Sequence, residues 1–171
     1  MLPWHNRTIL ETVITAVQDS GCSELVIVAN PLTAAFVKNL NVHFVINEKF
    51  ENGMTSSIQA GITELSDADA YMICPGDLPL ITVEEYRRVM QEFRKAWKED
   101  PEVIALPLYQ GKKGHPVIFS AHHRDEILAH DQPEGCSGIV RSNIAHVRKV
   151  EMESENGTAD IDTREDYDGN L

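Results

Sequence analysis

Short apolar runs alternate with helical patterns along this chain, and that alternation is the feature that most constrains its fold. Residues 25–29 (LVIVA) and 70–74 (AYMIC) are apolar throughout, as expected for strands buried on both faces of a sheet. Residues 8–20, ahead of the first run, and residues 54–64, between the two runs, read as helices. This order predicts an α/β protein with a Rossmann-like mixed, mostly parallel sheet and helices on both faces.

Two capping boxes mark helix starts, Thr8 with Glu11 and Thr82 with Glu85. The helix behind the second box carries an apolar face made by Tyr86, Val89, Met90, Phe93 and Trp97. The remaining patterns predict strands at residues 42–46, 103–108, 116–119 and 147–152, short helices at 33–40, 121–130 and after Gly138, and a polar loop at 110–114. We expect His122, His123 and His130 at the surface, because no cysteine or carboxylate stands at metal-ligand spacing from them.

The composition excludes several classes of partner. The 171 residues carry a net charge of −12, so bulk charge favours neither nucleic acid nor an anionic membrane. Nucleotides stay possible, because a metal ion or a helix N-terminus can hold phosphate on an acidic protein. Three widely spaced cysteines do not suggest a disulfide framework, and no signal peptide opens the chain. We therefore expect one domain that resides in the cytoplasm.

Asp77 is the first candidate for chemistry. It follows the apolar run 70–74 within Pro75-Gly76-Asp77-Leu78-Pro79-Leu80. Ligands of open α/β sheets bind at the carboxyl ends of strands, and a carboxylate there is a suitable ligand for Mg²⁺. The other interpretation is an aspartate that only stabilises a turn.

Three further segments are candidates. Asp160 and Asp162 either bring a second carboxylate to the metal or belong to a solvated acidic tail. Residues 53–57 (GMTSS) either meet a phosphate, base or ribose or form an ordinary helix start. The loop 111–116 (GKKGHP) either approaches an anionic substrate or is a solvated hairpin turn.

Four segments, taken in order, resemble the molybdenum cofactor cytidylyltransferase-like family of the MobA-like NTP transferases. Residues 2–11 look like the "LLPW…TLLE" stretch that opens the first helix of that family, and residues 53–61 (GMTSSIQAG) look like "GmssSLraG". Residues 75–80 (PGDLPL) look like the "GDqPl" turn. Residues 114–119 (GHPVIF) with 160–166 (DIDTRED) look like "GHPVLF…DIDTPEDL".

The resemblance implies Mg²⁺-dependent transfer of CMP from CTP to the terminal phosphate of molybdopterin, with loss of pyrophosphate. Asp77 would hold Mg²⁺, and Asp162 or Asp160 would complete the metal site, with Asp77 and Asp162 as the catalytic pair. The residues near the nucleotide would be Gly53, Ser56, Ser57, Pro75 and Gly76. Gly114 and His115 would shape the pocket for the pterin substrate.

One departure from the family pattern affects these expectations. Family members begin with a strand, central in the sheet, and a glycine-rich loop "LAAGxSxRMGxxK" that wraps the triphosphate. Met1 falls where that loop would have ended, so roughly 20 residues of the pattern have no counterpart and the domain over residues 1–171 is expected to be N-terminally incomplete. Without such a strand, its neighbours would keep unpaired backbone groups or close up.

Three interpretations of this departure remain open. The start of the coding sequence is assigned too far downstream, or another chain completes the sheet, or the protein is a degenerate relative that no longer binds NTP. The alternative function is therefore a non-catalytic module for pterin binding or assembly. A second copy of the chain and a molybdoenzyme are both open as protein partners.

Overall fold

The computed structural model describes residues 3–4, 6–65 and 67–159. Up to residue 65 the elements are β1 (Pro3–Trp4), β2 (Arg7–Thr8), α1 (Ile9–Asp19), β3 (Val26–Ala29), α2 (Ala34–Val37), β4 (His43–Ile46), the 3₁₀ turn η1 (Phe50–Asn52) and α3 (Met54–Glu64). Both predicted capping boxes are present, with Thr8 and Thr82 each accepting from the backbone N–H of the glutamate three residues on.

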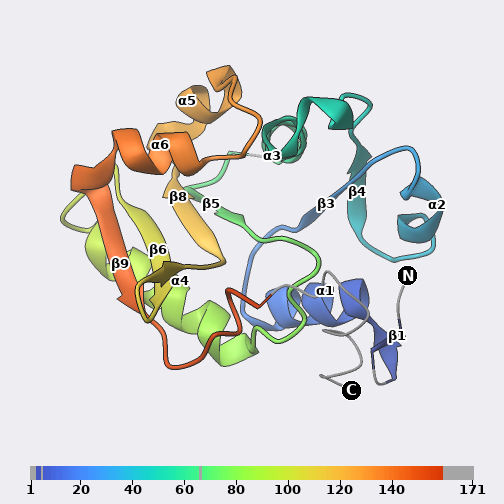
Figure 1. Cartoon of the computed structure of the whole chain (residues 1–171), viewed down its shortest axis with the longest axis horizontal. Helices are drawn as coiled ribbons and strands as arrows, with labels where there is room; N and C mark the ends of the chain where they lie inside the picture. The colour runs from blue at the N-terminus through green and yellow to red at the C-terminus, as the bar shows by residue number, and fades with distance from the viewer. Residues whose placement is uncertain (1–2, 5, 66, 160–171) are drawn as a thin grey trace.

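The remaining elements follow the same alternation (Figure 1). They are β5 (Ala70–Ile73), α4 (Val83–Trp97), β6 (Ile104–Tyr109), β7 (Lys112–Lys113), β8 (Val117–Ser120), η2 (Ala121–His123), α5 (Arg124–Ala129), α6 (Ser137–Ser142), η3 (Ile144–His146) and β9 (Val147–Glu151). The predicted loop 110–114 thus contains a short strand, and the predicted helix 121–130 starts as a 3₁₀ turn. Within the described residues, no helix has the length and apolarity needed to cross a membrane.

The described strands form a larger sheet and a separate pair. In the five-stranded sheet, β5 pairs with β8, β8 with β6, and β6 with both β7 and β9. The β6–β9 pair is parallel, whereas β8 is antiparallel to both β5 and β6, so β5, β6 and β9 share one direction. Strands β3 and β4 pair with each other in parallel and with no other described strand. The α/β class is confirmed, and the sheet is interrupted between β3 and β5.

Helices cover both faces of the larger sheet because the apolar side chains of its strands alternate between the two faces. On one face, Val89 and Phe93 of α4 pack with Ala105 of β6 and Ile118 of β8. The opposite face packs against α3, α5 and α6 through a core that includes Ile62, Ile104, Leu106, Phe119, Ile127 and Ile139. A buried run that packs on both faces is the arrangement expected for a central strand such as β6.

Helix α3 lies antiparallel to the strands on either side of the interruption. Its first turn meets the carboxyl end of β4, where the Asn47 side chain donates to Ser56 and Ser57. In its middle, Gly61 lies so close to β3 that an added Cβ would be 2.9 Å from Val28 Cγ2. Its last turn leads within a few residues into the start of β5. Strands β3, β4 and β5 therefore share one direction, and their carboxyl ends lie at the same edge of the fold.

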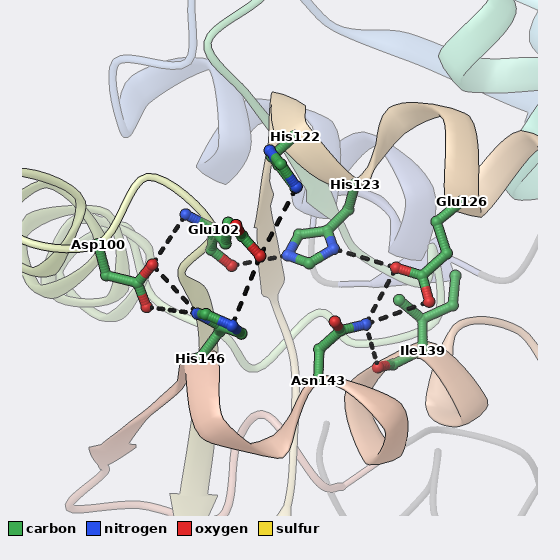
Figure 2. A network of polar contacts seen from close by, with 8 residues as sticks. All are labelled: Asp100, Glu102, His122, His123, Glu126, Ile139, Asn143 and His146. Carbon is green, nitrogen blue, oxygen red and sulfur yellow. Dashed lines mark hydrogen bonds and ion pairs between the residues drawn. The ribbon is translucent and has the colours of Figure 1, made fainter.

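The expectation that His123 lies at the surface is wrong. Its side chain is buried, its Nε2–H donates to the carbonyl of Glu102 at 2.7 Å, and its Nδ1 lies 3.2 Å from the Glu126 carboxylate (Figure 2). The neighbouring His122 remains exposed and makes a longer contact of 3.6 Å with Glu102. Sequence periodicity could not separate two adjacent histidines, because the change from a 3₁₀ turn to α5 decides which ring turns inward.

We predict that His123→Leu destabilises the fold by about 2 kcal/mol, because it leaves the Glu102 carbonyl without its buried donor. The matched variant His122→Leu changes the free energy of unfolding by about 0.5 kcal/mol or less, since it removes only an exposed contact. Urea unfolding of the three proteins measures both differences. Equal effects of the two variants would show that the buried contacts of His123 do not stabilise the fold.

Candidate functional site

Asp77 lies in the turn that follows β5, at the carboxyl edge of the sheet. Its Oδ1 is buried and has no hydrogen-bond partner among the described residues. Burial raises the pKa of the nearby Cys74 thiol to about 11, and the Asp77 charge adds to that rise although a hydrogen bond with Tyr86 opposes it. A buried carboxylate oxygen without a donor is costly, and a hard cation such as Mg²⁺ or Mn²⁺ would satisfy it. The residues present therefore fit a metal ligand at this position.

Gly76, which precedes Asp77, lies close to the start of α1. A Cβ at this position would be 3.1 Å from Leu10 Cδ1, so a larger residue would push the turn away from the helix. The close approach fixes the path of the backbone just before the Asp77 carboxylate. The glycine in this motif is therefore explained by packing, whatever ligand binds there.

Ser56 and Ser57 lie in the first turn of α3, next to the carboxyl end of β4. The buried Asn47 donates through Nδ2 to Ser56 Oγ at 2.8 Å and to Ser57 Oγ at 3.0 Å. Its backbone N–H also donates to the Ala29 carbonyl of β3 at 2.7 Å. Asn47 thus holds both hydroxyls at the edge where the parallel strands end. Sequence reasoning missed it, and its place directly after an apolar strand was the available signal.

Gly53 caps α3 with φ of 89°, a conformation that favours glycine, and a Cβ there would be 2.6 Å from the Pro133 carbonyl oxygen. The Thr55 N–H donates to that same carbonyl at 3.5 Å, and the Thr55 hydroxyl donates to the carbonyl of Gln132. The loop around Pro133 therefore covers part of the helix N-terminus. The Thr55 amide points to this loop rather than to an external anion.

Gly114 and His115 pack against the segment that leads towards the C-terminus. The His115 N–H donates to the Gly157 carbonyl at 2.8 Å, and a Cβ on Gly157 would be 2.4 Å from the His115 carbonyl oxygen. A Cβ on Gly114 would likewise be 2.8 Å from the Gly157 oxygen. These contacts require glycine or a similarly small residue at positions 114 and 157. The signal for Gly157 was not recognised in the sequence, because its partner lies far away along the chain.

Glu85, in the first turn of α4, forms hydrogen bonds with the segment that contains Gly157. Besides its own capping box, its carboxylate accepts hydrogen bonds from the hydroxyl of Ser154 and, at 3.0 Å, from the side chain of Asn156. Burial by itself raises the pKa of Glu85, but hydrogen bonds from Asn156, Ser154 and Thr82 outweigh it and hold that pKa below the ordinary 4.5. The ionised side chain therefore anchors the segment that packs on Gly114 and His115.

A cavity of about 630 Å³ lies where the sheet is interrupted, and we call it the central slot. At one end it is lined by four of the residues singled out in the sequence, Ser57, Pro75, Gly76 and His115. The fold thus brings together three motifs that are distant in sequence. Ser56, Asp77 and Gly114 adjoin these residues in the chain, and Gly53 adjoins Met54, which also lines the slot. The predicted site therefore gathers at the carboxyl edge of the strands.

Other predicted contributors are placed differently. Asp160 and Asp162 lie outside the described residues, so their relation to Asp77 stays a prediction. Lys112 and Lys113 are exposed on β7, which pairs with the end of β6. Arg94, on the last turns of α4, is the only lysine or arginine among the described residues that line the slot. No cluster of three or more potential metal ligands occurs within residues 3–4, 6–65 and 67–159.

A model of the MobA-like NTP transferase domain matches residues 1–149. The chain belongs to this family. It is 28% identical to the molybdenum cofactor cytidylyltransferase of Escherichia coli K12, over 98% of this chain and 83% of that protein. It is also 24% identical to the nicotine blue oxidoreductase of Paenarthrobacter nicotinovorans, over 96% of this chain and 83% of that protein. These two relatives carry names with different activities.

Solved structures show the same fold. Rv0371c of Mycobacterium tuberculosis superposes with a TM-score of 0.84 at 22% identity, over 100% of this chain and 87% of that one. The same protein in complex with manganese gives a TM-score of 0.81 at 21% identity, over 100% of this chain and 89% of that one. The family model describes an NTP transferase domain, and the Mycobacterium tuberculosis protein with this fold has been solved in complex with manganese.

We predict that Glu85→Gln destabilises this MobA-like domain by about 2 kcal/mol at neutral pH, because several donors lose an ionised acceptor. The matched variant Glu11→Gln changes the other capping box and costs less, because the hydrogen bonds of the Glu11 carboxylate within the described residues all come from Thr8. Since the folded pKa of Glu85 is lowered, its contribution is full above pH 4.5 and is lost as the pH falls through the folded pKa. Chemical unfolding of both variants between about pH 3 and pH 7 tests this. If the difference in free energy of unfolding between the two variants did not shrink on acidification, the stabilising role of the ionised Glu85 would be contradicted.

Proposed function

We propose that this MobA-like chain is a Mg²⁺-dependent cytidylyltransferase that transfers CMP from CTP to the terminal phosphate of molybdopterin. The observation that carries the proposal is the buried Oδ1 of Asp77, which lacks a partner among the described residues at the carboxyl edge of the strands. The family match supports nucleotidyl transfer. The Escherichia coli relative, named as a molybdenum cofactor cytidylyltransferase, favours CTP and a molybdopterin acceptor.

The reaction depends on positioning the two substrates and neutralising their charge, and it needs no reactive side chain. The acceptor phosphate is already anionic, so its oxygen attacks the α-phosphorus of CTP as the bond to pyrophosphate breaks. Bound Mg²⁺ would offset the negative charge of the triphosphate during this exchange. Asp77 would hold the metal, and Asp162, or Asp160, is proposed as the second carboxylate from the tail.

The other residues of the edge orient the two substrates. The Ser57 hydroxyl, which accepts from Asn47, would donate to the nucleotide. The Ser56 hydroxyl donates to the carbonyls of Gly53 and Lys49, so Ser56 would act by holding the first turn of α3 beside the nucleotide. Gly53 and Gly76 let the backbone pack closely against Pro133 and Leu10, and together with Pro75 they would leave room for the nucleotide at this edge. Gly114 and His115, fixed against Gly157, would form the side of the pocket that receives the pterin.

We predict that Asp77→Asn lowers kcat/KM for CMP transfer at least about 100-fold, the range seen when one preorganised electrostatic contact is removed. The matched control is Asp67→Asn, a carboxylate that lines the same slot but lies in the segment ahead of β5, away from the carboxyl edge. Activity is followed as pyrophosphate release with CTP, molybdopterin and Mg²⁺, and in parallel with Mn²⁺. An Asp77→Asn variant that released pyrophosphate at the unchanged rate would exclude Asp77 as a metal ligand.

Calorimetric titration of CTP with Mg²⁺ separates this function from the alternative one. Binding that Asp77→Asn abolishes and Asp67→Asn preserves is the expected result. Molybdopterin binding without any influence of CTP would instead favour the non-catalytic module for pterin binding or assembly.

A further inference from the structure

Helix α3 begins without the side-chain cap that starts α1 and α4. Those two helices open with capping boxes at Thr8 and Thr82, whereas α3 opens at Gly53, which has no side chain to accept from the first turn. The amides of a first turn have no partner within their own helix, so they need acceptors from elsewhere. This turn carries Ser57, which lines the central slot. Whatever holds the turn in place therefore also places Ser57.

The loop between α5 and α6 supplies an acceptor for this turn, and we call its residues 131–135 the strap. It lies beside α3 (Figure 1). The carbonyl of Pro133 accepts from the Thr55 N–H at 3.5 Å, and the hydroxyl of Thr55 donates to the carbonyl of Gln132. The same hydroxyl accepts from the Gly135 N–H at 3.0 Å. Thr55 thus joins the first turn of α3 to the strap through both its backbone and its side chain.

Glycines allow the strap and the helix to approach closely. Gly135 has φ of 78°, and a Cβ there would be 3.0 Å from Met54 Sδ. On the helix side, Gly53 packs against Pro133 in the same way. Thr55 is only 4% exposed, so water cannot replace the strap as its partner. A buried hydroxyl and a buried amide that lost each other would both be left unsatisfied, which is costly.

A second side chain of α3 holds the segment that leads into the strap. Gln59, one helical turn after Thr55, donates through Nε2 to three carbonyls at the end of α5, those of Ile127 at 3.0 Å, Leu128 at 3.1 Å and His130 at 2.8 Å. Residues four apart lie on the same face of a helix, so one face of α3 holds both contacts. Gln59 secures the end of α5, and Thr55 alone of the two reaches the strap.

We propose that Thr55 is a positioning residue for CMP transfer, which fastens the strap to the first turn of α3 and so fixes where Ser57 meets the nucleotide. Two positions along a helix differ by about 200° in direction, so Thr55 and Ser57 face opposite sides of the turn. Asn47 holds the Ser57 side from the end of β4, and the strap holds the Thr55 side. This role rests on the proposed function, since it requires that the nucleotide bind at Ser57.

Replacing Thr55 by valine keeps the shape of the side chain and removes its hydroxyl. We expect Thr55→Val to raise KM for CTP about 10-fold while kcat stays within about 3-fold, because a binding contact is weakened and the reacting phosphate is not touched. Thr55→Ser keeps the hydroxyl and should hold KM within about 2-fold of the unchanged protein. Pyrophosphate release with CTP, molybdopterin and Mg²⁺ measures both constants.

The matched control is Gln59→Leu, which removes three hydrogen bonds from the same face of α3 but leaves its first turn intact. It should lower the free energy of unfolding in urea and leave KM for CTP within about 2-fold. A rise in KM for Gln59→Leu as large as that for Thr55→Val would overturn the proposal, because the effect would then follow stability alone. Failure of Thr55→Ser to keep KM low would overturn it as well.

Hydrogen exchange of the unchanged protein tests the same role without turnover and without a substitution. Addition of CTP with Mg²⁺ should slow exchange of the Thr55 and Gly135 amides and leave the amides of α4 unchanged. If CTP binds and Asp77→Asn stops CMP transfer, but these two amides or the KM of Thr55→Val do not change, the proposed function stands and the role of Thr55 falls. No effect of CTP on any amide, with no pyrophosphate release, would overturn both.

Discussion

Backbone pairing across the middle layer is the constraint on which the rest of this structure depends. The strand edges of β3 and β5 face each other across an apolar cavity of about 630 Å³ instead of sharing a ladder. Packing of α3 on one side and of α1 and α4 on the other holds the two parts of the sheet in one orientation. The helical layers are thus continuous where the strand layer is not, and they preserve the shape of the slot.

The same arrangement explains why the candidate site is located at one end of the slot. Parallel strands bring their carboxyl ends to a common edge, and the turns after β4 and β5 carry Asn47 and Asp77 there. Long-range contacts then complete the edge. Glu85 holds Ser154 and Asn156, and Gly157 packs on His115, so the segment before the C-terminal tail is directed to this edge. Geometry at the site is therefore set by packing between motifs that are far apart in sequence.

The polar network around His123 and His146 joins one buried side chain, His123, to partly exposed charged partners (Figure 2). His146 lies 3.0 Å from Asp100 and 3.5 Å from Glu102, while His123 donates to the Glu102 backbone. Burial by itself raises the pKa of Asp100, but hydrogen bonds from His146 and the Glu102 N–H outweigh it and lower that pKa. These contacts join the loop after α4, the turn before α5 and the turn before β9. Their effect is on the stability of the far side of the domain rather than on the slot.

The sequence by itself determined the class of fold and the order of its elements, because apolar runs, helical periodicity and capping boxes act over a few residues. Both capping boxes, α3 at residues 54–64 and the strand that ends before Asp77 follow from such local signals. Local patterns could not identify Asn47, Glu85 or Gly157, since each is defined by partners distant in the chain. They could not place His123 inside and His122 outside either. Only the tertiary structure decided that the predicted sheet is divided, because pairing between strands depends on how helices pack across both faces.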